Sequence, residues 1–412
     1  MRHAIDIQKT TAAKIEIADI FRCHIGDYLK RYKMPPEHYK VVYDILNCRT
    51  AYLGGHIERC DQCAAQRIMY NSCRNRHCPK CQTIAKERWL EARQAELLPV
   101  KYFHNVFTLP HQLNPLVLCN KRLMLGLLFK ATTQTLLQFA GNPDNALGGK
   151  LGIIAILHTW TQTLKDHFHL HCLVPGGVLT ENCQQWQHCQ GDFLFPVKAL
   201  SKVFRGKFIS FLEHAYEQNQ LNFHGNTRAL GTPKGFRRLI KLLWSKKWVV
   251  YTKKPINRPE WVLDYLGRYT HRVAISNHRI CGFSGGCVTF TVKNRKLKTT
   301  EKVTLDAVEF IRRFLLHVVP KKFMRIRHYG FLANRSKKKD IGICRALLGL
   351  QSDLPKLEKR TPNQIMLALT GTDYSKCPCC RTGKMRKIIE ISQGTGFNSF
   401  NIIWSNRKER SP

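Results

Sequence analysis

Three histidines alternate with bulky apolar residues in one short stretch of the chain. The stretch reads DHFHLHCLV from Asp166 and contains His167, His169 and His171. Successive side chains of a β-strand point to opposite faces, so the three imidazoles share one face while the apolar residues between them enter the core. One strand histidine is usually structural, but three at this period predict a metal site.

An adjacent pair of these histidines is expected to dominate that site. Residues two apart in a strand lie about 7 Å apart at Cα, whereas His167 and His171 lie about 13 Å apart. Two imidazoles with open coordination positions suit a catalytic divalent ion better than a closed structural one.

Two tyrosines further along the chain could supply a nucleophile. NRPEW (257–261) is typical of a helix start, and Tyr265 and Tyr269 follow four residues apart on one helix face. Taken alone, the pair is most often aromatic packing. Arg268 and Arg272 follow at once and could stabilise charge on a phosphate. A phenol has a pKa near ~10, so its attack requires such help and a metal that polarises the phosphate.

The charge of the chain indicates its partner. Its 412 residues hold 67 Lys and Arg against 28 Asp and Glu, a net charge of +39, which favours nucleic acid over an anionic membrane or an acidic protein. No apolar run reaches the ~18 residues of a membrane span, and the start lacks a signal-peptide core. We therefore expect a cytoplasmic protein in which a tyrosine attacks a DNA phosphodiester to give a 5′-phosphotyrosine and a free 3′-hydroxyl.

A cysteine-rich block near the N-terminus predicts structural zinc. Two C-x-x-C pairs lie there, with Cys73-x3-His77 just before the second pair. The seventeen cysteines are odd in number and no export signal is visible, so metal is favoured over disulfides. We expect the ligands Cys60, Cys63, Cys78 and Cys81, with Cys73 and His77 as alternates. Another pair, Cys377 and Cys380, lacks an obvious partner pair.

The elements that must position these residues predict an α+β fold. Amphipathic helices occupy residues up to about 50, and a helix follows the cysteine block. Short β-rich runs separated by helices fill 100–300, which favours a mostly antiparallel sheet over a doubly wound fold. We expect a helical and zinc-binding domain at 1–95, a catalytic domain at 96–300, and a basic helical region with a poorly ordered tail at 301–412.

A basic stretch in the C-terminal region predicts a nucleic-acid groove. Residues 321–339 carry eight Lys or Arg and no acid, interleaved with three aromatic residues on which bases can stack: Phe323, Tyr329 and Phe331. A solvated charged face is the alternative interpretation.

Four segments together resemble a known family. They are YNSCRNRHCPKCQ (70–82), HFHLHCLVPGG (167–177), the Y-x3-Y of YLGRYTHRVAISN (265–277) and RIRHYGFLANR (325–335). In this order they resemble a two-tyrosine rolling-circle insertion-sequence transposase of the HUH endonuclease superfamily, with an N-terminal zinc-binding domain.

The resemblance implies an enzyme that nicks and transfers single-stranded DNA at the ends of its own element. The implied DNA partners are single-stranded or hairpin ends and a short target site, with no membrane partner. The implied place of action is the nucleoid of a bacterial cell. The metal-binding pair falls on His169 and His171, with His167 as a further candidate, and the ion is Mg²⁺ or Mn²⁺. The paired nucleophiles fall on Tyr265 and Tyr269. The expected fold is an antiparallel HUH-type sheet with the histidines on a central strand, the tyrosines on a neighbouring helix, and the DNA-contacting arginines Arg268, Arg272, Arg325 and Arg327.

Two alternatives remain open at this stage. A replication initiator or conjugative relaxase of the same superfamily would share the chemistry and differ in the DNA that it serves. A non-catalytic zinc-dependent DNA-binding regulator would have structural histidines and tyrosines packed away from them, whereas a nucleophile must approach the metal-bound phosphate.

Overall fold

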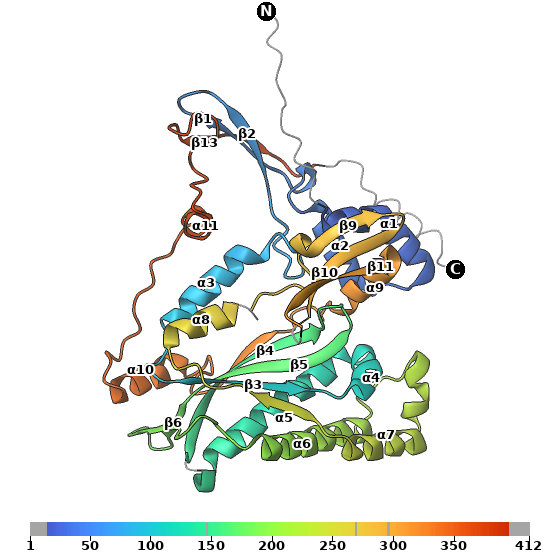
Figure 1. Ribbon diagram of the computed structural model, residues 1–412, viewed down its shortest axis with the longest axis vertical. Coiled ribbons are helices and arrows are strands. Elements are labelled where there is room, and N and C mark those ends of the chain that lie inside the picture. The colour runs from blue at the N-terminus through green and yellow to red at the C-terminus, as the bar shows by residue number, and fades with distance from the viewer. Residues whose placement is uncertain (1–14, 146, 268–269, 295–296, 395–412) are drawn as a thin grey trace, which may run out of the picture.

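The computed structural model describes residues 15–145, 147–267, 270–294 and 297–394 (Figure 1). Within these ranges the largest sheet has seven antiparallel strands in the order β7-β6-β4-β5-β3-β8, with β12 paired to β4 beside β6. The predicted α+β class with a mostly antiparallel sheet is confirmed. The strands are β3 (Tyr102–Thr108), β4 (Gly149–Trp160), β5 (Asp166–Pro175), β6 (Gly177–Thr180), β7 (Trp186–His188), β8 (Val249–Thr252) and β12 (Ile326–Gly330).

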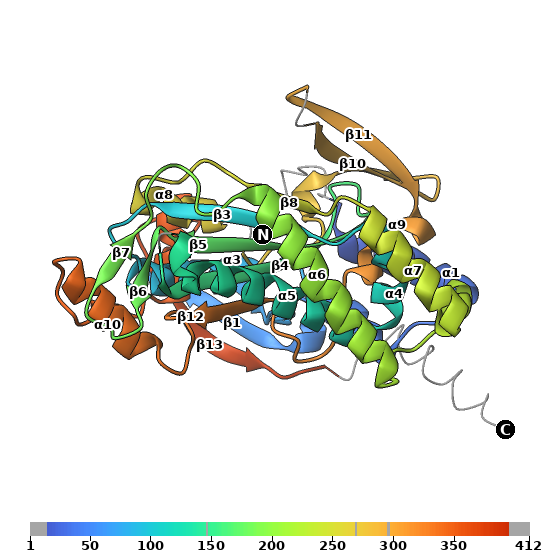
Figure 2. The same ribbon diagram turned by 90° about the horizontal axis from the view of Figure 1, so that it is seen from below.

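Four helices of the described ranges cover one face of this sheet (Figure 2). The apolar residues between the strand histidines, Phe168 and Leu170, point to this face and are almost fully buried. Phe107 of β3 lies opposite Leu170 and packs edge-on against Phe204, with ring centroids 5.2 Å apart. The period-two pattern thus fixes which face of β5 is core. The covering helices are α4 (Asn114–Cys119), α5 (Lys121–Gly141), α6 (Val197–Glu217) and α7 (Pro233–Ser245).

Three further helices lie on the opposite, histidine-bearing side. They are α3 (Gln82–Gln94), α8 (Pro259–Gly267) and α10 (Lys337–Leu347). Val262 and Leu266 of α8 share a small core with Leu90 of α3 and with apolar residues of the sheet. Gly267 allows the close approach of the two helices, because a Cβ there would lie 3.3 Å from a methyl group of Leu90. Helix α8 is therefore held by the sheet and by α3.

The predicted N-terminal helices form and share a core with a distant segment of the chain. Phe21 of α1 packs edge-on against Phe314 of α9 at 5.4 Å, and Phe290 of β10 lies 5.9 Å from Phe310. Apolar burial therefore joins the first described helices to residues beyond 274. This unit contains α1 (Ile17–Arg31), α2 (Pro36–Asn47), β9 (Ile280–Ser284), β10 (Cys287–Asn294), β11 (Thr299–Asp306) and α9 (Ala307–Leu316).

A separate three-stranded sheet stands at the top of Figure 1. It contains β1 (Gly55–Cys60), β2 (Gln66–Tyr70) and β13 (Met385–Ile391), with β13 antiparallel to β1. The segment leading to β13 includes α11 (Pro362–Thr370), which contacts α3. Short 3-10 helices link other elements: η1 (Ala51–Leu53), η2 (His111–Leu113), η3 (Pro143–Asn145), η4 (Gly225–Gly231) and η5 (Asn277–Arg279).

Strand pairing crosses both predicted domain boundaries. The region 301–412, predicted to be helical, also supplies β12 to the central sheet and β13 to the small sheet. Part of the predicted loose tail is therefore a strand, because β13 finds its hydrogen-bond partners in β1. Residues 395–412 and 1–14 lie outside the described residues. No helix among the described residues is long and apolar enough to cross a membrane.

Candidate active site and cysteine clusters

Three histidines from two neighbouring strands meet on the side of the central sheet that faces α3 and α8. His158 of β4 lies opposite His169 of β5, and His171 follows two residues later on the same face. One ring nitrogen of each lies within 4.8 Å of the others, an arrangement that could hold a metal ion. The structure thus brings the predicted pair together and adds His158 as a third candidate ligand.

His167 has a different place in this arrangement. Its ring centroid lies 4.5 Å from that of His169, but it does not join the group of ring nitrogens. Its backbone carbonyl accepts a hydrogen bond of 2.8 Å from Nδ1 of His169. This bond places the His169 proton on Nδ1 and leaves the Nε2 lone pair for a metal, as metal-binding histidines usually require.

Tyr265 is connected to the cluster through His104 of β3. Its hydroxyl hydrogen-bonds Nδ1 of His104, while Nε2 of His104 lies 2.8 Å from Nδ1 of His171. The amino group of Lys253 lies 5.2 Å from the centre of the Tyr265 ring. The phenol of Tyr265 therefore faces the histidines and is not packed away from them, in contrast to what the regulator alternative expects of it.

Burial keeps the imidazoles of His104, His169 and His171 in the neutral form that binds metals. Desolvation and the charge of Lys253 lower the pKa of His104 to about 3. Desolvation, followed by the neighbouring histidines, lowers the pKa of His169 and of His171 well below the ordinary value. At neutral pH each ring therefore offers a lone pair, which a protonated imidazole could not do.

The structure describes only some of the other predicted site residues. Tyr269 and Arg268 lie outside the described residues. Arg325 donates from its guanidinium to the backbone carbonyls of Arg272, at 3.2 Å, and of Arg76, at 3.3 Å, and burial lowers its pKa to about 10. Arg325 therefore ties segments of the protein together, and only the carbonyl of Arg272 takes part in that contact.

Arg327 lies in a basic cavity of about 500 Å³. Its guanidinium stacks over Phe129 at 4.1 Å and over Phe323 at 4.8 Å from the ring centres. Arg122 and Lys322 also line the cavity. Phe129 and Phe323 are 0% and 3% exposed and Phe331 is 0% exposed, so these rings belong to the core and bases cannot stack on them. The cavity has the predicted basic lining, whereas the predicted stacking on Phe323 and Phe331 is wrong.

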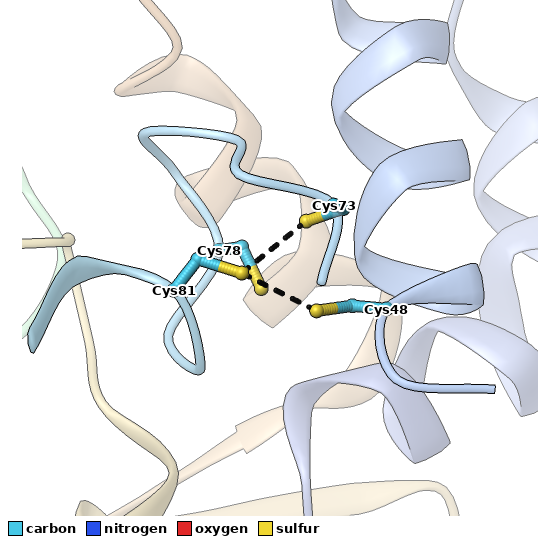
Figure 3. Close-up of side chains that lie close together, drawn as sticks. All are labelled: Cys48, Cys73, Cys78 and Cys81. Atoms are coloured by element: carbon cyan, nitrogen blue, oxygen red, sulfur yellow. Dashed lines mark hydrogen bonds between the residues drawn. The ribbon is translucent and has the colours of Figure 1, made fainter. Parts of the chain in front are cut away.

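The predicted zinc ligands divide between two cysteine clusters. In the first, Cys78 and Cys81 meet Cys73 and Cys48, with the Cys81 sulfur 3.6 Å from Cys73 and 3.4 Å from Cys48 (Figure 3). Cys48 comes from the end of α2, so this site joins the cysteine block to the N-terminal helices. The alternate Cys73 thus lies beside the second predicted pair.

The second cluster corrects the predicted set of four. Cys60 and Cys63 lie with Cys377 and Cys380, not with Cys78 and Cys81. The reason is the pairing of β1 with β13, which carries the first knuckle away from the second and toward the C-terminal segment. His77 is buried near the first cluster, and among the described residues it joins neither group.

Sequence analysis missed three residues of these sites because none of them belongs to a motif: His158, His104 and Cys48. His158 and His104 are single histidines inside apolar strand sequences, and Cys48 is an isolated cysteine at a helix end. Only strand order and register place the two histidines beside β5. The one signal in the sequence is a histidine inside the β-rich run KYFHNVFTL and another directly after the β-rich run LGIIAIL.

Comparison with known proteins identifies the class of protein that this fold and site define. A family model described as "Transposase zinc-binding domain" matches residues 20–109, and one described as "Putative transposase" matches residues 152–340. These ranges contain the first cysteine cluster, the three histidines and Tyr265.

Two relatives agree with the family models. The chain is 46% identical over 384 residues to "Putative transposase y4qJ" of Sinorhizobium fredii, covering 92% of this chain and 96% of the relative. It is 28% identical over 299 residues to "Transposase for insertion sequence element IS801" of Pseudomonas savastanoi pv. phaseolicola, covering 72% and 70%. No solved structure matches the chain. The chain belongs to the IS91 family of insertion-sequence transposases, which confirms the resemblance of its motifs.

Proposed function

We propose that this transposase nicks and rejoins single-stranded DNA at the ends of its own element by a rolling-circle mechanism of the HUH type. The observation that carries the proposal is the alignment of Tyr265, His104 and His171 beside a three-histidine group. In the reaction the Tyr265 oxygen bonds to phosphorus, the 3′-oxygen leaves, and a 5′-phosphotyrosine conserves the bond energy. Tyr269 is proposed as the second nucleophile, which receives the other strand.

The histidine group fits a catalytic divalent ion. Three imidazoles at one face of a sheet leave coordination positions open for phosphate oxygens and water. These would supply the oxygen ligands that Mg²⁺ and Mn²⁺ prefer, and we propose one of these ions there. When bound, the ion would polarise the scissile phosphate and stabilise the charge that develops on it. His169 would bind through Nε2, because its Nδ1 donates to the carbonyl of His167.

Hydrogen bonds that connect His171 to Tyr265 through His104 would activate Tyr265 as a nucleophile. With Nε2 assigned to the ion, His171 carries its proton on Nδ1 and donates to Nε2 of His104. His104 then carries its own proton on Nδ1 and donates to the Tyr265 oxygen. This donation favours the phenolate over the phenol, and the nearby Lys253 ammonium acts in the same direction. The phenol proton passes to water as the phosphorus bond forms.

The basic cavity around Arg327 lies on the α5 side of the sheet, opposite the histidines, and is proposed to bind the DNA backbone away from the reacting phosphate. The guanidinium of Arg327 and the cations of Arg122 and Lys322 can contact phosphates without reading a sequence. We propose that the zinc of the first cysteine cluster is structural, because four sulfurs close the coordination shell and leave no position for substrate.

A covalent-adduct assay tests the proposed reaction. Purified protein is incubated with labelled single-stranded oligonucleotides from the flanks of its own gene, with Mg²⁺ or with chelator, and separated by denaturing electrophoresis. The expected result is a metal-dependent adduct on one flank that Tyr265→Phe reduces at least about a hundredfold.

Tyr251→Phe is the matched control, because Tyr251 lies on β8 with its side chain largely exposed. It should form the adduct at the wild-type rate. Tight binding without an adduct on any flank would contradict the proposed chemistry. An adduct that persists undiminished in Tyr265→Phe would contradict the assignment of the nucleophile.

A further inference from the structure

The second cysteine cluster has the dimensions of a closed metal site. The sulfur of Cys60 lies 3.7 Å from that of Cys380, and the sulfur of Cys63 lies 3.5 Å from that of Cys377. Tetrahedral zinc with Zn–S bonds of about 2.3 Å separates its sulfurs by about 3.8 Å, whereas a disulfide joins them at about 2.05 Å. The spacing therefore fits four thiolates around one ion, and all four cysteines are free of disulfides.

The two halves of the cluster repeat one backbone conformation. In each, the amide two residues after the first cysteine donates to its sulfur: Gln62 to Cys60 at 3.4 Å and Cys379 to Cys377 at 3.4 Å. The residue after the second cysteine is left-handed in both, with φ of 60° at Ala64 and 62° at Arg381. Amide donation to sulfur favours the thiolate, so both turns are built to present metal ligands.

Gly383 shows how closely the two turns meet. A Cβ at this position would lie 2.3 Å from the sulfur of Cys60, and its amide donates to the sulfur of Cys380 at 3.3 Å. Asp61 completes the contact, because its carboxylate accepts from the Lys384 amide at 2.8 Å. The first turn therefore fits against the second although about 320 residues separate them.

The surrounding sheet lacks a hydrophobic core that could hold it without a metal. No described residue of β1, β2 or β13 belongs to any of the three buried apolar clusters. Ile68 of β2 and Ile389 of β13 are 53% and 54% exposed, whereas Cys60 and Cys377 are 3% and 1% exposed. An isolated small sheet is marginal in water, so its buried cysteines must supply the missing stability.

We propose that Cys60, Cys63, Cys377 and Cys380 bind a second structural zinc ion, which fastens the C-terminal segment to the N-terminal cysteine block. Neither family model reaches Cys377, so the site extends the zinc-binding unit beyond residues 20–109. The fastened segment runs along α3, where the Arg360 Nε donates to Glu91 at 2.7 Å. Zinc at this site would therefore hold the C-terminal segment against α3, the helix that packs on α8.

Metal analysis of the full chain tests the second site. The comparison uses a His169→Ala background, so that zinc at the histidines does not enter the count. Zinc content should be about two ions per chain and fall to about one in Cys377→Ser/Cys380→Ser. Cys379→Ser is the matched control, because Cys379 is exposed, lies between the two ligands and is outside the cluster. It should retain both ions.

Thiol labelling of the wild-type protein provides a test that does not depend on the variants folding. Cys63 and Cys379 are both exposed, but only Cys63 belongs to the cluster. Maleimide should label Cys379 at once and Cys63 only after a strong chelator is added, as peptide mapping by mass spectrometry would show. Equal labelling before chelation, an unchanged zinc count in the double variant, or iron in place of zinc would overturn the proposal. None of these readouts depends on DNA cleavage, so the proposed function is tested separately.

Discussion

The histidine cluster and the second cysteine cluster hold their side chains in opposite ways. His158 and His169 face each other across two neighbouring strands of the central sheet, and Phe168 behind them is buried in the largest core. Cys60 and Cys380 meet at the end of a small sheet whose strands contribute nothing to any apolar cluster.

This difference indicates what each metal would do. Packing and strand register hold the histidines in place, so the site should keep its shape without an ion and use the ion for chemistry. The cysteines lie where packing is poor, so their ion should contribute to folding itself. The first cysteine cluster is intermediate, because Cys48 and Cys78 are buried within the core of the N-terminal helices.

The largest effect should come from His169→Ala. Single-turnover adduct formation should fall about a thousandfold, since a bound divalent ion supplies several kcal/mol of charge stabilisation. The free energy of unfolding should change by less than about 2 kcal/mol, because the core on the other face of β5 is untouched. His188→Ala, an exposed histidine on β7 of the same sheet, is the control and should change neither quantity. If His169→Ala lost its structure cooperatively, packing and strand register would not be what holds the histidine cluster in place.

Cys78→Ser should act mainly on stability, in contrast to His169→Ala, which should act mainly on the rate of adduct formation. It removes a ligand of the first cluster and should lower stability by several kcal/mol, seen as a fall of about 10 °C in the melting temperature. A strong chelator should lower the melting temperature of the wild type similarly and have little further effect on the variant. Cys281→Ser, at an exposed cysteine on β9, should leave stability unchanged. A variant as stable as the wild type would show that packing alone holds this cluster.

The sequence predicted those parts of the fold that have a local periodic signal. The histidine strand follows from its alternation, and the N-terminal helices follow from their apolar spacing. The pairing of β13 with β1 has no such signal, because most side chains of β13 are exposed and its partner lies more than 300 residues away. A linear pattern carries no information on which distant strand will supply hydrogen bonds.

The residues of the candidate site likewise divide into those with a local sequence signal and those placed only by strand pairing. His169 and His171 are predictable because the period of a strand places both on one face. His158 is a single histidine at the end of an apolar strand, and only the register of β4 against β5 brings it to the site. The same reason explains the zinc ligands, since two C-x-x-C pairs close in sequence can each find a different partner pair in space.

The smallest of these effects is expected at His104, which should prepare Tyr265 without binding the ion. His104→Ala removes the group between the Tyr265 hydroxyl and Nδ1 of His171, so adduct formation should slow about 10-fold to 100-fold, the usual cost of losing a group behind a metal ligand. The maximal rate should fall while the Mn²⁺ concentration for half-maximal rate stays nearly constant, whereas His169→Ala should shift that concentration.

Two companion variants sharpen the role of His104. His104→Gln can bridge the same two partners and should recover part of the rate, because its amide can both donate and accept. His224→Ala is the control, since His224 directly precedes η4, which contacts α4 and α7 on the helix-covered side of the sheet. If His104→Ala weakened Mn²⁺ dependence as strongly as His169→Ala does, His104 would belong to the ion's own ligand set. The rigid sheet would then hold four metal-binding imidazoles, and Tyr265 would depend on the ion directly.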